Sequence, residues 1–211
     1  YSGDAERCIA VYHKGNIIDG YKILYVCGIF LKSQGKLNGN PVVTTVMSNM
    51  GLYKAFEAEG INYEQTAVGD KYVAENMLEN NYSIGGEQSG HVIFSLYAAT
   101  GDGILTSLMI MEACVEQKAT LCDLAKEMKV YPQILRNVRV ADKKTARENP
   151  KVVEAVEAAA RALSTDGRIL VRESGTEPLI RVMVEAGTEE ICAEHVNNVV
   201  RVMEEEGLVV E

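Results

Sequence analysis

The feature that most constrains this chain is the alternation of short apolar runs with segments of helical periodicity over its first 130 residues. Runs rich in Val, Ile and Thr favour strands, while spaced apolar residues behind Ser or Asp caps favour helices. A hairpin turn at 13–16 precedes the apolar pair Ile17 and Ile18. We expect strands at 7–12, 41–46, 63–68, 83–86 and 91–95, and helices at 19–34, 48–60, 70–80, 101–118 and 121–129. Such alternation predicts layers in which crossover helices cover a sheet.

The pattern changes near Tyr131 and Pro132. Residues 142–151 (DKKTARENPK) are polar and rich in charge, and they predict a break in regular structure. Around that break we expect strands at 134–140, 168–171 and 179–185, and helices at 152–164 and 188–206. The sequence therefore predicts an α/β domain followed by a smaller α+β domain, with the boundary between residues 131 and 145.

Charge and cysteine content narrow the classes of partner. The chain has 21 Lys and Arg against 30 Asp and Glu, a formal charge of −9, and no basic block. This balance disfavours nucleic acid and anionic membranes as partners, and no apolar run approaches the roughly 18 residues of a membrane span. The five cysteines form no CxxC motif, which indicates free thiols and a cytoplasmic protein. Because the chain starts at Tyr1 without a targeting segment, we expect it to be a piece of a longer protein.

The segment RILVRESGTEPLIR at 168–181 has the residues needed to hold a phosphate group. Ser174, Gly175 and Thr176 offer backbone N–H groups and hydroxyls in a tight loop, and Arg172 and Arg181 offer planar guanidinium groups. The alternative is a hairpin connection whose arginines lie on a solvated face.

The segment GGEQSGH at 85–91 could bind neighbouring sugar hydroxyls. Glu87 and Ser89 supply acceptors and a donor, and His91 and Lys71 are further candidates for substrate contact. The alternatives are a polar turn between two strands, a structural histidine, and a plain helix start at Gly69-Asp70.

A third candidate lies at the start of the chain. Ser2, Asp4 and Glu6 place oxygen atoms at alternating positions, as in loops that bind Mg²⁺, and Arg7 could contact a phosphate. The alternative is an acidic, frayed terminus.

Taken together, these motifs resemble the phosphohexomutase superfamily, and most closely its bacterial phosphoglucosamine mutases. The resemblance rests on GEQSGH at 86–91, RESGTEP at 172–178 with Arg181, VGDKYV at 68–73, TGDG at 100–103 and TTVMSN at 44–49. It implies four domains, three of them α/β/α layered. Residues 1–20 would be the tail of the metal-loop domain, 21–133 a three-layer α/β/α sugar-binding domain with a mixed sheet, and 134–211 the α+β phosphate-binding domain.

The resemblance also implies a reaction, the interconversion of glucosamine 6-phosphate and glucosamine 1-phosphate through a phosphoserine and a bisphosphate. Arg7 would act as a catalytic residue that neutralises charge with Mg²⁺, while Glu87 and Ser89 hold the sugar. The group Arg172, Ser174, Gly175, Thr176 and Arg181 would hold the other phosphate. The implied partners are a hexosamine phosphate, its bisphosphate, the missing N-terminal domains and a possible second copy.

Two departures from the family pattern affect that expectation. No Ser-His-Asn-Pro phosphoserine loop occurs in the chain, so we expect the chain alone to be inactive. The family pattern has Asp where this chain has Ser2 and Glu6, and Tyr21 also stands where an Asp is expected. These changes predict weak Mg²⁺ binding. Two alternatives remain, a non-catalytic sugar-phosphate module or metal-deficient homologue, and an interaction role for the acidic final helix.

Overall fold

The computed structural model describes residues 1–12 and 14–210, so the turn expected at 13–16 includes His13, which lies outside the described residues. The chain divides into two compact units, Tyr1–Val130 and Tyr131–Glu211. No helix among the described residues is long and apolar enough to cross a membrane.

The first unit is built on a mixed four-stranded sheet. Its strand order is β4-β3-β5-β6, in which β3 runs parallel to β4 and β5, and β6 runs antiparallel to β5. The strands are β3 (Pro41–Thr45), β4 (Asn62–Thr66), β5 (Ile84–Gly86) and β6 (Val92–Phe94). All five residues of the central strand β3 are buried, as expected for a strand with both faces covered.

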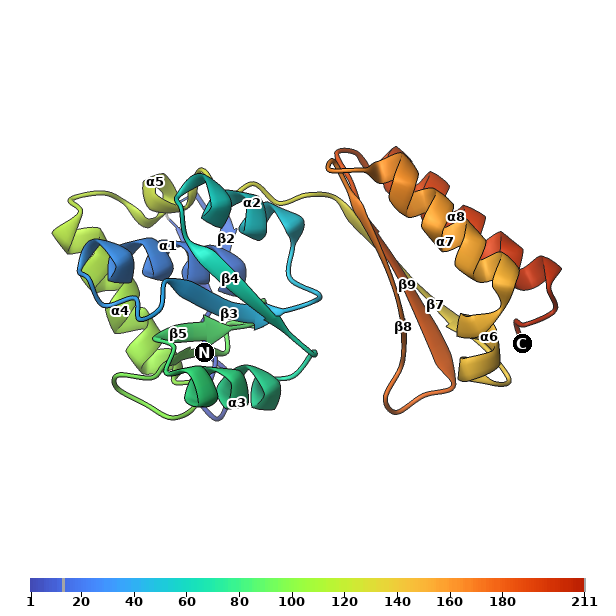
Figure 1. Ribbon diagram of the computed structural model, residues 1–211. Helices are drawn as coiled ribbons and strands as arrows, with labels where there is room; N and C mark the ends of the chain where they lie inside the picture. The colour runs from blue at the N-terminus through green and yellow to red at the C-terminus, as the bar shows by residue number, and fades with distance from the viewer. Residues whose placement is uncertain (13, 211) are drawn as a thin grey trace. The chain divides into compact units, whose positions relative to one another are not determined.

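Helices cover both faces of this sheet, which gives the three layers expected from the sequence (Figure 1). Val42 and Ile84 join a core with α1 (Gly20–Ser33), α2 (Met50–Ala58), α4 (Gly103–Glu116) and α5 (Leu121–Ala125). Val43 points to the opposite face, where Val73 and Met77 of α3 (Asp70–Asn80) pack with Ile93. Neighbouring residues of one strand thus supply two cores, because side chains alternate across a sheet.

Local hydrogen bonds explain where two helices start. The Asp19 side chain accepts the Lys22 N–H at 3.2 Å and caps α1, as the sequence predicts. We expected the second helix to begin at Ser48, but Asn49 is its cap, with its side chain accepting the Gly51 N–H at 3.0 Å. The hydroxyl of Ser48 instead bonds the Thr44 hydroxyl within the preceding strand and turn.

The expected strand at 7–12 is shorter than predicted. Only β1 (Ala10–Val11) pairs with β2 (Ile17–Ile18), in a two-stranded ribbon. Arg7 forms an isolated antiparallel bridge with His91 instead. The N-terminal segment is therefore attached to the 85–91 loop through its backbone.

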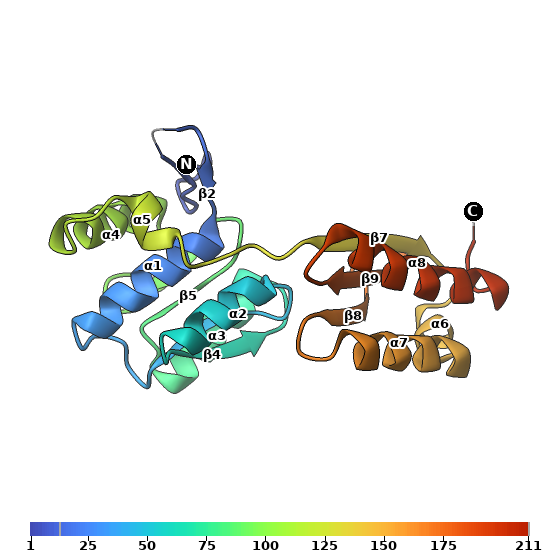
Figure 2. The same cartoon turned by 90° about the horizontal axis from the view of Figure 1, so that it is seen from above.

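The second unit is an antiparallel three-stranded sheet with helices on one face (Figures 1 and 2). The order is β7-β9-β8, with β7 (Gln133–Arg139), β8 (Arg168–Glu173) and β9 (Leu179–Glu185). Ile180, Val182 and Val184 of β9 pack with α7 (Pro150–Leu163) and α8 (Glu189–Glu205). The polar stretch 142–151, expected to be a break, contains the short helix α6 (Lys143–Glu148), because Asp142 accepts the Thr145 N–H and caps it.

The other face of this sheet carries three rows of side chains that cross all three strands, followed by the pair Arg139 and Leu179 on β7 and β9. At one end Glu185, which is fully buried, bonds Arg168 at 2.5 Å and Gln133 at 3.2 Å. The middle row is apolar, and the third pairs two arginines beside an asparagine. The middle row is Leu135, Met183 and Leu170, and the third is Asn137, Arg181 and Arg172.

Candidate functional site

The arginines of the predicted phosphate loop lie side by side. Arg172 at the end of β8 and Arg181 near the start of β9 are directly opposite each other in the antiparallel register. Antiparallel partners have Cβ atoms about 5 Å apart, so two positive side chains share one small area of the sheet. Two like charges at this spacing repel each other, and an anion bound between them would offset that repulsion.

The guanidinium groups of Arg172 and Arg181 make few hydrogen bonds to the described residues. The Nε atoms of Arg172 and Arg181 are buried, and neither has a partner in the described part of the chain. Arg181 reaches Glu177 only at 3.5 Å and the Ser174 hydroxyl at 3.4 Å. Burial, and then the neighbouring Arg181, lower the pKa of Arg172. Donors without acceptors at a site of positive charge are suited to an incoming phosphate.

The loop between these arginines is held at its first residue and open at its tip. Ser174 is 1% exposed, its N–H donates to the Leu179 carbonyl at 2.9 Å, and its hydroxyl accepts the Glu177 N–H at 3.4 Å. Gly175 and Thr176 are exposed, and a Cβ added to Gly175 would meet no atom within 4 Å. The loop therefore has room for a ligand at its tip.

Two residues of α6 support this loop, and the sequence analysis did not identify them. The Lys143 ammonium donates to the Ser174 carbonyl at 2.8 Å, and the Arg147 guanidinium lies 3.2 Å from the Glu173 carboxylate. A run of charges such as DKKTARE could have suggested an anion-binding helix, but which loop it contacts depends on the tertiary fold.

The 85–91 loop in the first unit is packed closely against its surroundings. The Glu87 carboxylate accepts the Gly69 N–H at 3.1 Å, and the Gly20 N–H donates to the Gln88 carbonyl at 3.0 Å. A Cβ on Gly20 would lie 1.9 Å from the Glu87 carbonyl oxygen. Ser89, at the tip, is exposed. The backbone of this loop is thus fixed by neighbours, and Glu87 and Ser89 are placed close together on it.

His91 is a buried residue of the first unit, and two acidic side chains approach its ring. It is 2% exposed, and neither ring nitrogen has a hydrogen-bond partner among the described residues. Its Nε2 lies 3.9 Å from both Glu6 and Asp70. A Cβ on Gly101 would lie 2.4 Å from the same nitrogen, so this glycine leaves the space that the ring occupies. The fold therefore brings Glu6 and His91 together.

Lys71 does not join this group in the structure. Its side chain is largely exposed, and its ammonium lies 3.6 Å from the Glu75 carboxylate one turn along α3. Arg7 is also exposed, although its backbone pairs with His91. Both side chains are long enough to reorient toward a ligand.

The residues of the predicted metal loop contact one another and His91. The Ser2 hydroxyl donates to Asp4 at 2.5 Å, and this bond lowers the pKa of the Asp4 carboxyl group. The Glu6 side chain approaches His91, and the Glu6 N–H donates to the Asp4 carboxylate at 3.3 Å. Among the described residues, no group of three or more His, Cys, Asp or Glu side chains could hold a metal ion. Ser2, Asp4 and Glu6 offer oxygen atoms but only two carboxylates, so weak Mg²⁺ binding by this loop stays a prediction.

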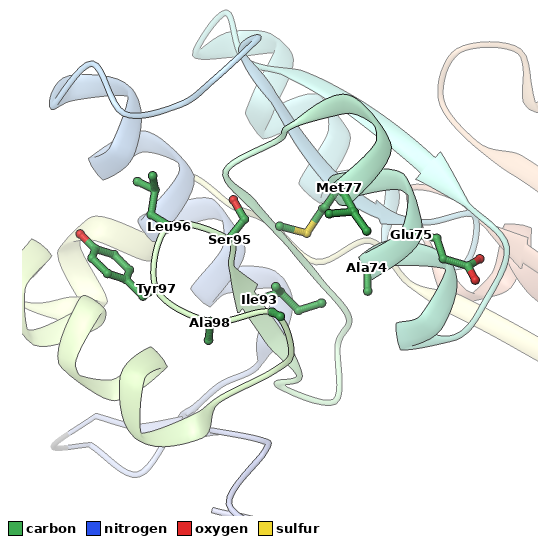
Figure 3. Close-up of a pocket in the computed structure, with 10 residues that line it drawn as sticks. Ala74, Glu75, Met77, Ile93, Ser95, Leu96, Tyr97 and Ala98 are labelled. Carbon is green, nitrogen blue, oxygen red and sulfur yellow. The ribbon is translucent and has the colours of Figure 1, made fainter.

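A hollow of about 420 Å³ in the first unit has a different character (Figure 3). It lies between α3 and the segment that follows β6, and Met77, Ile93, Leu96 and Tyr97 are among its lining residues. Glu75 points outward at its edge in Figure 3. None of the predicted site residues lines this hollow, so it is separate from the candidate site.

Known protein families match the chain in two consecutive parts. The model for phosphoglucomutase/phosphomannomutase alpha/beta/alpha domain III matches residues 19–131, more than half of the chain. This chain belongs to the phosphohexomutase superfamily. The model for the C-terminal domain of the same family matches residues 135–202. The family resemblance and the α/β fold class expected from the sequence are therefore confirmed.

Curated relatives within this superfamily are named phosphoglucosamine mutases. The protein of Lachnospira eligens is 59% identical over 210 residues, which cover 100% of this chain and 47% of the relative. The protein of Bacillus subtilis is 52% identical over 206 residues, which cover 98% of this chain and 46% of the relative. The chain thus spans about half the length of the curated relatives it matches.

Solved phosphohexomutase structures share the fold. An N-acetylphosphoglucosamine mutase of Aspergillus fumigatus has a TM-score of 0.78 at 19% identity and covers 98% of this chain and 48% of its own. An N-acetylglucosamine-phosphate mutase in its product complex has a TM-score of 0.76 at 23% identity and covers 96% and 48%. Another Aspergillus fumigatus structure is a complex with GlcNAc-6P and magnesium. At these identities the likeness shows the fold alone.

Proposed function

We propose that this chain is the C-terminal part of a phosphoglucosamine mutase, and that it binds the hexosamine phosphate on which that enzyme acts. The observation that carries the proposal is the pair Arg172 and Arg181, two adjacent guanidinium groups whose buried Nε atoms have no partner among the described residues. The names of the curated relatives support glucosamine phosphate as the substrate.

In this proposal the second unit holds the phosphate that does not react. The guanidinium groups of Arg172 and Arg181 donate to its oxygens, and the backbone N–H groups of Gly175 and Thr176 donate at the open tip of the loop. Ser174 acts mainly by fixing the loop, because its N–H and hydroxyl are engaged within it. Binding energy at a remote phosphate helps to align the reacting end of the substrate.

The first unit binds the sugar. Glu87 and Ser89 accept and donate hydrogen bonds to neighbouring hydroxyls, and the packing of Gly20 beneath the loop keeps them in place. His91 offers a donor or acceptor from inside the site, while Lys71 and Arg7 approach the phosphates from solvent.

The phosphoryl transfer itself requires groups that this chain lacks. A phosphoserine in an upstream domain passes its phosphoryl group to the free hydroxyl of the substrate, the bisphosphate reorients, and the serine regains the other phosphoryl group. Since the chain contains no Ser-His-Asn-Pro segment, the 211-residue chain alone does not turn over substrate. Detectable mutase activity of the purified chain would contradict this statement.

Residues 1–20 would then end a metal-loop domain, with the sugar-binding domain over 21–133 and the phosphate-binding domain over 134–211. Mg²⁺ belongs to the implied family chemistry, but we propose that the loop with Ser2, Asp4 and Glu6 binds it weakly. The free thiols suit a cytoplasmic enzyme.

Calorimetry with matched ligands tests the binding role. The chain is titrated with glucosamine 6-phosphate, with glucosamine, and with inorganic phosphate. We expect the sugar phosphate to bind more tightly than either fragment, and its affinity to fall as ionic strength rises. Equal affinities for glucosamine and glucosamine 6-phosphate would exclude the phosphate-binding role.

The sequence of the metal loop favours a second candidate function, a non-catalytic module that binds a sugar phosphate. A parent protein that keeps the sugar-phosphate site but has lost turnover could carry a metal loop with only two carboxylates, as this chain does with Asp4 and Glu6 beside Ser2. Joining the upstream part of the Lachnospira eligens relative to this chain separates the two functions. Activity that appears only after Ser2→Asp, Glu6→Asp and Tyr21→Asp are combined favours the non-catalytic module, whereas activity without these changes favours the mutase.

A further inference from the structure

Helix α4 is apolar on the side that faces solvent as well as on the side that faces the core. Thr106, Met109, Ile110 and Ala113 are buried against the first unit. On the outer side, apolar side chains follow one another at spacings of four, three and four residues. These are Ile104 (56% exposed), Leu108 (56%), Met111 (53%) and Val115 (72%), and we call them the outer stripe. A helix that is apolar all round is normally buried all round.

The beginning of the chain lies against this helix. The Tyr1 hydroxyl donates to the Ser107 hydroxyl at 2.9 Å, and the Gly103 N–H donates to the Ala5 carbonyl at 2.8 Å. A Cβ on Gly103 would lie 2.6 Å from the Arg7 carbonyl oxygen, so the two segments are in close contact. Any chain that precedes Tyr1 therefore joins the first unit next to α4.

The same N-terminal stretch contains a second uncovered apolar surface. Val11 and Ile17 are paired across the β1–β2 ribbon, and both are more than 60% exposed. An isolated two-stranded ribbon is marginally stable in water. Ile18, on its other side, is buried in the core of the unit. The ribbon is thus anchored on one face and uncovered on the other.

We propose that the outer stripe of α4 is the contact surface for an upstream domain, an inference that rests on the proposed function, in which this chain is the C-terminal part of a longer mutase. The family models match domain III and the C-terminal domain, and the relatives are about twice as long, so upstream domains exist in proteins of this layout. The contact with Tyr1 places such a domain beside α4. An apolar partner face would bury the four side chains, as in interfaces between domains.

Thiol labelling tests the proposal independently of mutase activity. Leu108→Cys is prepared in the chain alone and in a fusion that carries the upstream part of the Lachnospira eligens relative before Tyr1. Rates of reaction with a maleimide are corrected for the five native cysteines by measuring each parent. Glu154→Cys, on the exposed side of α7, is the matched control.

We expect the fusion to label Leu108→Cys about tenfold or more slowly than the chain alone, because a covered thiol reacts slowly. The control should label at the same rate in both proteins. Equal rates for Leu108→Cys in both proteins would overturn the proposal. If the fusion does not fold, the upstream part is added in trans, where the same protection is expected and its absence overturns the proposal.

A second copy of the chain is the competing occupant. If the stripe joined two copies, the chain alone would sediment as a dimer, Leu108→Glu would return it to a monomer, and the proposal would be wrong. We expect instead that the chain sediments as a monomer with or without Leu108→Glu. Because none of these measurements uses substrate, their failure is distinct from failure of the proposed function.

Discussion

The two candidate binding loops, 85–91 in the first unit and 172–181 in the second, differ in what surrounds them. In the 85–91 loop, Glu87 bonds the Gly69 N–H, and the loop backbone bonds the neighbouring segments and lies against Gly20. In the 172–181 loop, two arginines face each other with buried Nε atoms that have no partner among the described residues. Hydrogen bonds and close packing fix the first loop, whereas the second presents adjacent positive charges. In the proposed function, sugar binding would therefore depend on packing and phosphate binding on charge.

Filling the space beneath the 85–91 loop should have the largest effect. Gly20→Ala places a methyl group 1.9 Å from the Glu87 carbonyl oxygen and 2.8 Å from the Gly90 nitrogen, both backbone atoms. We expect the free energy of unfolding of the first unit to fall by about 3 kcal/mol. Urea titration followed by hydrogen exchange of residues 20–33 measures it. Gly3→Ala, which meets nothing within 4 Å, is the control, and an unchanged midpoint for Gly20→Ala would refute the packing argument.

Removing one arginine should separate binding from stability. Arg172→Met deletes a half-buried charge beside Arg181, so we expect affinity for glucosamine 6-phosphate to fall by about 1.5–3 kcal/mol. The free energy of unfolding should stay the same or rise, because burial and the neighbouring Arg181 already disfavour the charge. Calorimetry and thermal melts measure the two quantities. Arg201→Met is the control, because the Arg201 side chain is exposed on α8 and its loss should change neither affinity nor stability. Loss of both binding and stability would assign Arg172 to the fold alone.

Restoring acids in the N-terminal loop should raise metal affinity. In Ser2→Asp combined with Glu6→Asp, carboxylates replace the hydroxyl that now bonds Asp4 and the longer side chain near His91. We expect Mg²⁺ to bind roughly tenfold more tightly, since affinity rises with ligand charge. Competition with Mn²⁺ followed by electron paramagnetic resonance measures the change, with Glu64→Asp as the control. No gain in affinity would mean that the loop conformation, not its charge, prevents binding.

Removing the contact between α6 and the 172–181 loop should have the smallest effect on ligand affinity. Lys143→Ala removes the bond to the Ser174 carbonyl, and we expect affinity for glucosamine 6-phosphate to fall by about 1 kcal/mol. Lys144→Ala is the control, because Lys144 is the exposed next residue of α6. If both variants bind alike, α6 does not position the loop.

The order of strands and helices could be predicted from the sequence because it depends on local periodicity. Periodicity does not predict which core each side chain joins. The apolar run around Val42 and Val43 predicts a buried strand, but it does not show that Val42 packs in one core and Val43 in the other. The predicted elements differ from the structure where contacts between distant residues or local capping decide the conformation. The strand at 7–12 is cut short because Arg7 pairs with His91, and α6 forms in a stretch too polar to show an apolar face.

The chemistry of the candidate site could be predicted in part. Residue types indicated Arg172 and Arg181, but only the register of β8 and β9 places them opposite each other. Lys143 and Asp70 were missed because each acts on a residue far along the chain, Ser174 and His91 respectively. Spacing in the metal loop suggested that Ser2, Asp4 and Glu6 share a site, and only the fold shows that the Glu6 side chain also lies 3.9 Å from His91.

The rows of side chains on the face of the second sheet that carries Arg172 decide where its positive charge is available. Arg168 and Arg172 lie on the same strand four residues apart, or roughly 13 Å in an extended chain. The buried carboxylate of Glu185 already neutralises Arg168, and the apolar row separates the two positions. Because Glu185 already pairs with Arg168, we expect an anion to be attracted to the end of the sheet that holds Arg172 and Arg181. In the proposed function, one end of a doubly phosphorylated sugar would bind there while its other end stays available for chemistry elsewhere.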